Sequence, residues 1–150
     1  MIRTVIAWLM VFVGIALMVC GSTVWGQAVE PLVQVSGKSP FGPLTRCGNF
    51  PGVVAGTGIN FLNSEIEPWV DVNSTNPHNI VALWQQDRWS NGGARSNVAG
   101  VSFDGGITWE VSVVPGLTDC SGGAFERASD PWLSFAPDGT LHHISLLFNI

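Results

Sequence analysis

The stretch Ser102-Phe103-Asp104-Gly105-Gly106-Ile107-Thr108-Trp109 decides the fold of this 150-residue chain, because its constrained positions together predict one turn. Asp104-Gly105-Gly106 predicts a tight hairpin turn, since glycine adopts the positive φ that a side chain resists. The Asp104 carboxylate can accept hydrogen bonds from backbone N–H groups of its own turn, and the Ser102 hydroxyl can bridge the two strand ends. Trp109 begins the return strand, where its indole can fold over the hairpin.

This spacing of serine, aspartate, glycine, threonine and tryptophan resembles the Asp-box, or BNR repeat, of the sialidase superfamily. The matching residues are Ser102, Asp104, Gly106, Thr108 and Trp109. The resemblance implies a β-propeller blade in which the box is structural and lies on the outer rim. We therefore interpret Asp104 as a turn residue and not as a catalytic acid.

A second pattern, an acidic residue followed by proline, tryptophan and an aliphatic residue, occurs twice. Glu67-Pro68-Trp69-Val70 recurs 63 positions later as Asp130-Pro131-Trp132-Leu133. A turn and an apolar run follow each copy, Ile80 to Trp84 in the first and Ile144 to Phe148 in the second. Self-similarity is typical of repeat architectures, although this period exceeds the roughly 40–50 residues of compact propeller blades. We infer an inserted loop within or between blades.

Short apolar segments bounded by Gly, Pro, Asn or Asp predict β-strands from Glu67 onward. The expected strands of the first blade are Trp69 to Val72, Asn79 to Gln85, Ser96 to Ser102 and Trp109 to Val114. No stretch beyond residue 28 shows helical periodicity over ten residues. The sequence therefore predicts an all-β fold, a partial sialidase-like β-propeller with about one blade and the start of a second.

The N-terminal residues 1–28 are typical of a signal peptide. Arg3 supplies a short positive region, Val5 to Val19 is an apolar run, and Gly26-Gln27-Ala28 offers small residues for cleavage. The apolar run is short for a membrane span, and Cys20 follows a residue that fits a lipoprotein signal poorly. We expect a secreted or periplasmic protein cleaved near Ala28, with membrane attachment only through an uncleaved signal or a lipid anchor.

Two further segments follow the signal peptide. Residues 29–63 are rich in Gly, Pro, Ser and Asn and predict an irregular leader, whereas residues 64–150 predict an incomplete sialidase-like propeller with its Asp-box at 102–109. Since closing a propeller ring takes several hundred residues at this period, we expect the chain to be an N-terminal fragment.

Charge and cysteine content restrict the partners. The chain has six Lys and Arg against eleven Asp and Glu, a net charge of −5, which argues against nucleic acid. In an exported protein, Cys47 and Cys120 predict a disulfide. The spacing of the two cysteines fits neither a zinc site nor a redox motif. No acidic residue or cysteine is spaced with the histidines to form a metal site. We therefore expect no metal and no cofactor.

Glycoside hydrolysis needs two groups that flank the scissile bond, and sialidases use a tyrosine as nucleophile. The resemblance places the second-strand Asp-Arg element of sialidases on Asp87-Arg88, which are therefore the catalytic candidates. It also puts Glu67-Pro68-Trp69 where sialidases have a carboxylate-binding arginine. The loop Trp89 to Asn97 contains Arg95 but no acid/base carboxylate, and the chain contains no tyrosine.

Trp89, Glu126 and Arg127 are candidates for binding a ligand, because they lie beside strand ends where propeller loops converge. Arg88 is the expected partner of a ligand carboxylate, with Asp87 pointing away into the packing of the blade. Trp69, Trp84 and Trp132 fall on expected strands and are interpreted as core.

Two functions remain open at this point, because fold alone does not decide between them. The first is an exported sialidase-like glycoside hydrolase that acts on sialylated or related glycans. The second is a non-catalytic β-propeller module that binds a glycan or a protein. The Asp87-Arg88 placement favours the first function, and the missing first-strand arginine favours the second.

Overall fold

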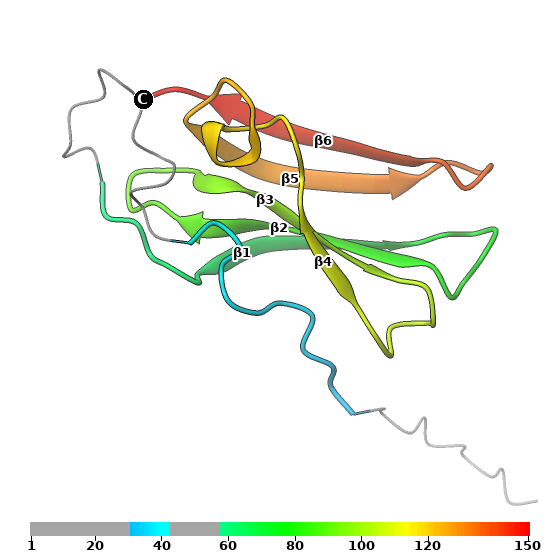
Figure 1. Cartoon of the computed structure of the whole chain (residues 1–150). Helices are drawn as coiled ribbons and strands as arrows, with labels where there is room; N and C mark the ends of the chain where they lie inside the picture. The colour runs from blue at the N-terminus through cyan, green and yellow to red at the C-terminus, as the bar shows by residue number, and fades with distance from the viewer. Residues whose placement is uncertain (1–30, 43–57) are drawn as a thin grey trace, which may run out of the picture. The chain divides into compact units, whose positions relative to one another are not determined.

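The computed structural model describes residues 31–42 and 58–150, and the fold lies in the unit Val33–Ile150. The predicted signal peptide and part of the predicted leader, with Cys47, lie outside the described residues. The strands are β1 (Glu65–Val72), β2 (Ile80–Arg88), β3 (Ala94–Ser102), β4 (Glu110–Val113), β5 (Arg127–Phe135) and β6 (Leu141–Phe148), with a short 3-10 helix, η2, at Asp119–Ser121 (Figure 1). The predicted all-β class is confirmed.

Strands β1 to β4 form an antiparallel meander in chain order, with β2 and β3 at its centre. β2 and β3 pair along their whole length, from Ile80 opposite Ser102 to Arg88 opposite Ala94, and β4 pairs with the C-terminal half of β3. β2 runs to Arg88, beyond the expected end at Gln85. The polar residues after Gln85 lack an apolar alternation, but they are held in the strand by pairing with β3.

The β5–β6 hairpin pairs with β3 only at Ala94 and Ala128. Farther along, Leu133 of β5 packs on Val81 and Leu83 of β2 to form one apolar cluster. Figure 1 shows β5 and β6 (orange and red) side by side, beyond the strands of the meander. The interface between the hairpin and the meander is therefore an apolar core.

The opposite face of the meander is covered by the segment 33–42. Phe41 packs against Trp84 and Val98, with Val35 at the margin of this second cluster. The segment 33–42, which the sequence predicted as part of an irregular leader, thus contributes to the core, although it contains no strand. Its apolar residues bury the face of β2 that β5 does not reach.

The two acidic-Pro-Trp segments adopt the same backbone geometry. Glu67 has φ +52° and Asp130 has φ +45°, left-handed values that residues other than glycine seldom adopt. Each lies in a β-bulge, between Ile66 and Trp69 in β1 and between Ser129 and Trp132 in β5. The sequence repeat is therefore a structural repeat.

The tryptophans of these two segments contact each other. The Trp69 and Trp132 rings stack with centroids 3.8 Å apart, and the Trp69 indole N–H donates to the Leu133 carbonyl at 2.8 Å. The interpretation of the strand tryptophans as core is right for Trp84, which is buried, and wrong for Trp69 and Trp132, which are 37% and 51% exposed. The bulge turns Trp69 and Trp132 toward each other instead of into a core.

Candidate functional site

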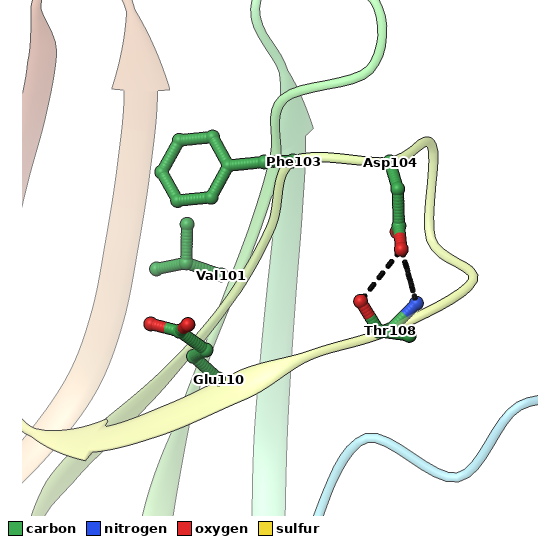
Figure 2. A pocket seen from close by; sticks show the side chains of 5 residues that line it. All are labelled: Val101, Phe103, Asp104, Thr108 and Glu110. Carbon is green, nitrogen blue, oxygen red and sulfur yellow. Dashed lines mark hydrogen bonds between the residues drawn. The ribbon is translucent and has the colours of Figure 1, made fainter.

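The Asp-box turn after β3 is held together by its own polar groups. The Ser102 hydroxyl donates to Asp104 at 2.9 Å and accepts from the Gly106 N–H at 2.8 Å. Both the backbone N–H and the hydroxyl of Thr108 donate to the Asp104 carboxylate, at 2.9 and 2.6 Å (Figure 2). The Trp109 indole N–H donates to the Gly106 carbonyl at 2.9 Å.

The hydrogen bonds from Thr108 lower the pKa of Asp104 to about 2. This carboxylate lines a small pocket, together with Val101, Phe103, Thr108 and Glu110. In Figure 2 it points toward Thr108, and Glu110 points to the other side of the turn. A carboxylate that is ionised and bonded within its turn is a poor proton donor, so Asp104 is not suited to acid catalysis.

The candidates Asp87, Arg88, Trp89 and Arg127 lie at the opposite end of β3. The antiparallel pairing of β2 and β3 brings the end of β2 beside the start of β3, and the Ala94–Ala128 pair adds the start of β5. Charged side chains from three strands therefore gather around the first residues of β3. We call this region the Asp87 end of the sheet.

Asp87 is fully buried and bonded on both carboxylate oxygens. One oxygen accepts from Arg95 at 3.2 Å and from the Ser39 hydroxyl at 2.5 Å, and the other accepts from the Asn63 N–H at 2.8 Å. Its φ of +62° is left-handed. Asp87 thus joins segments from distant parts of the chain, and both of its carboxylate oxygens are occupied by these contacts.

Arg95, which the sequence placed in a loop without a role, is the partner that completes this buried pair. It lies on β3 and is fully buried, and it also donates to the carbonyls of Gly42 at 2.7 Å and Phe41 at 3.4 Å. Burial lowers the pKa of Arg95, and the charge of Asp87 opposes that shift. The signal in the sequence was the opposite charge at equal distances from Asn91, four residues on either side, which makes the two residues cross-strand neighbours when the hairpin turn is centred there.

Arg88 is partly exposed. Its guanidinium donates to the Gly93 carbonyl at 3.0 Å, within the turn between β2 and β3. Its backbone N–H donates to the Ser64 hydroxyl at 2.8 Å, which joins β2 to the residue before β1. Arg88 is less suited to bind an anion than its position in the sequence indicates.

Arg127 and Trp89 form the second cationic feature of this end. The Arg127 guanidinium lies 4.1 Å from the centroid of the Trp89 ring, and the Arg127 residue is only 3% exposed. Its Nη1 donates to the Glu126 carbonyl at 3.4 Å, a long bond. Burial lowers the pKa of Arg127, and the charge of Glu126 opposes that shift.

Two buried donors at this place have no hydrogen-bond partner among the described residues, the Arg127 Nε and the Trp89 Nε1. Arg127 also has no carboxylate within 4.0 Å in the part of the chain that the structure describes. The adjacent Glu126 is 8% exposed and accepts from the Ile150 N–H at 3.2 Å. Unpaired buried donors beside a cation favour an acceptor-rich, anionic ligand.

Cys120 lies within η2 and packs beside the cluster of Phe41, Trp84 and Val98. Its predicted disulfide partner, Cys47, is outside the described residues, so the pairing stays a prediction that mass spectrometry with and without reduction would test. Within residues 31–42 and 58–150, no group of His, Cys, Asp and Glu could hold a metal ion. In the same residues no helix is long and apolar enough to cross a membrane.

Comparisons with protein-family models, with curated proteins and with solved structures give no significant match to this chain. The resemblance to Asp-box proteins therefore rests on the residues and contacts described above.

Proposed function

We propose that this chain belongs to an exported sialidase-like β-propeller protein that binds an acidic glycan at the Asp87 end of the sheet. In this proposal, β1 to β4 are one blade and β5–β6 begins the next. The four-stranded antiparallel order, the Asp-box turn between β3 and β4 and the repeated acidic-Pro-Trp bulge support it.

The observation that carries the binding function is the Arg127–Trp89 pair. A buried guanidinium without a carboxylate partner is costly, and a ligand carboxylate offers two oxygens that match its planar fork. Sialylated glycans supply such a carboxylate next to hydroxyl groups, which can accept from the Trp89 indole N–H. Arg127 replaces Arg88 as the proposed carboxylate partner, because Arg88 is bonded to its own turn.

Binding without catalysis is the first candidate, because Asp87 is occupied by Arg95, Ser39 and Asn63. Hydrolysis of sialylated glycans by the full-length protein is the second candidate. It is favoured by Glu126, a nearly buried carboxylate directly beside Arg127. A buried carboxyl group next to the bound sugar suits an acid/base role.

The test compares Arg127→Gln with Arg88→Gln in the exported protein, by calorimetric titration with sialyllactose and with lactose. We expect preference for the sialylated sugar, a loss of at least about tenfold in Arg127→Gln and little change in Arg88→Gln. Equal affinity for both sugars, or unchanged binding in Arg127→Gln, would contradict the proposal. Release of free sialic acid by the protein, and its loss in Glu126→Gln, would establish the second candidate.

A further inference from the structure

The turn between β2 and β3 contains the dipeptide Asn91-Gly92, which occurs once in this chain. In such a dipeptide the backbone nitrogen of glycine can attack the side-chain carbon of asparagine, because glycine has no Cβ to block the approach. Asparagine is accordingly one of the thermolabile residues in proteins. The reaction requires that the asparagine side chain can turn toward the next nitrogen, so the surroundings of Asn91 decide whether it occurs.

Few contacts restrain Asn91. The residue is exposed, and its side chain lies beside Gly58 without a hydrogen bond to any residue in the described part of the chain. The Gly92 N–H donates to the Trp89 carbonyl at 3.3 Å, a long bond that is easily broken. A Cβ added at Gly92 would meet no atom of a non-adjacent described residue within 4 Å, so the space around the attacking nitrogen is open.

Comparable positions in the same chain are restrained. Asn63 and Asn73 each precede serine, and the side-chain oxygen of each accepts a backbone N–H, at 2.8 and 3.0 Å. Asp104 and Asp138 each precede glycine, and each carboxylate accepts a threonine N–H of its own turn. Hydrogen bonds also lower the pKa of both carboxyl groups, and an ionised carboxylate resists attack by a nucleophile. Of these five positions, Asn91 is the one whose side chain is not held away from the next nitrogen.

We propose that Asn91 deamidates spontaneously to aspartate and isoaspartate. The Gly92 nitrogen loses its proton to base and attacks the Asn91 Cγ, and the new C–N bond displaces ammonia, which takes up the proton. Water then opens the resulting cyclic imide at either carbonyl carbon, which yields aspartate or isoaspartate. The net reaction hydrolyses one amide with one water molecule. Each event adds one negative charge to the turn, a covalent change that alters the electrostatics of the surface.

The new carboxylate lies in a turn that forms part of the proposed glycan site. Arg88 donates to the Gly93 carbonyl of this turn at 3.0 Å, and the Trp89 ring lies 4.1 Å from the Arg127 guanidinium. Residues 89–93 themselves carry no charge. Because a carboxylate in the turn attracts the same arginines as an acidic ligand, deamidation lowers the affinity for that ligand. This effect on binding rests on the proposed function, whereas the reaction itself does not.

The reaction is tested by incubating the exported protein at mildly alkaline pH and body temperature over several weeks, followed by peptide mass spectrometry. Trypsin cleaves after Arg88 and Arg95, so residues 89–95 form one peptide whose single amide side chain is that of Asn91. We expect this peptide to gain the mass difference between an amide and an acid and to elute as two products. An unmodified peptide 89–95, or faster modification at Asn63 or Asn73, would overturn the proposal.

The effect on binding is measured by calorimetric titration with sialyllactose, comparing Asn91→Asp with Asn91→Gln. Both variants replace the side chain, but only Asn91→Asp adds the charge. We expect a dissociation constant about threefold higher for Asn91→Asp at low salt, and a smaller difference as salt is added. Equal affinities would overturn the effect on binding. A wild type that binds no sialyllactose would contradict the proposed function alone, because the mass spectrometry requires no ligand.

Discussion

The two ends of β3 satisfy their polar groups in different ways. At the Asp-box end, the side-chain hydrogen bonds of Asp104 and Trp109 all join residues within 102–109. At the Asp87 end, the hydrogen bonds of Asp87 and Arg95 join residues up to 54 positions apart. A local network forms as soon as its turn forms, whereas a distant one requires the whole fold. Substitutions at the Asp87 end should therefore lower the stability of the fold more than substitutions at the Asp-box end.

Arg95→Met is expected to have the largest effect, because it leaves the Asp87 carboxylate buried without its cation. Breaking one side of a buried ion pair costs about 3–5 kcal/mol in the free energy of unfolding. Denaturant unfolding measures this loss. The double variant Asp87→Asn/Arg95→Met should recover part of it, and no recovery would show that the pair acts through its other contacts.

Trp109→Ala tests the Asp-box end and should harm folding more than binding. The indole is half-buried and bonded to the Gly106 carbonyl, so we expect a loss of about 2 kcal/mol, less than for a tryptophan in a core. Thermal melting and sialyllactose titration of the same protein measure the two effects. Unchanged melting with lost binding would assign Trp109 to the ligand site.

Asp104→Asn should change how stability depends on pH. Because the pKa of Asp104 in the folded protein is lowered to about 2, the carboxylate stabilises the fold above its unfolded pKa, and this contribution is lost as the pH falls from about 4 to about 2. Melting temperatures of the variant should fall less steeply over that range. Asp71 and Asp138, whose pKa values are also lowered by hydrogen bonds, leave a residual slope. Identical slopes in variant and wild type would contradict the assignment.

Arg127→Met should have the smallest effect on stability. It removes a desolvated cation that has no carboxylate partner among the described residues, and it also removes the contact with the Trp89 ring. These effects oppose each other, so we expect the free energy of unfolding to change by less than about 1 kcal/mol. A loss as large as that of Arg95→Met would show that Arg127 is structural and would weaken the binding proposal.

The features that the sequence predicted depend on local contacts, and the features that it did not predict depend on contacts between distant residues. The Asp-box turn was predictable because its donors and acceptors are fixed by spacing within eight residues. The repeat was also visible, but not its left-handed Glu67 and Asp130, since backbone conformation at a bulge depends on the partner strand. The role of Arg95 was missed because the chain shows no apolar pattern from Gln85 to Arg88, and the length of β2 decides which residue faces Asp87.

The side chains of Asp104 and Trp109 bond within the Asp-box turn, whereas two backbone groups of the turn bond outside it: the Gly105 N–H donates to the His78 carbonyl at 2.9 Å, and the Ser102 carbonyl accepts from the Asn79 amide at 3.2 Å. The Asp104 carboxylate and the Trp109 indole find their partners without help from other strands. Residues 102–109 should therefore keep their conformation when grafted between two strands of an unrelated antiparallel hairpin. Such a graft would place an ionised carboxylate and an indole at fixed positions in the new protein, which makes this turn useful in protein design.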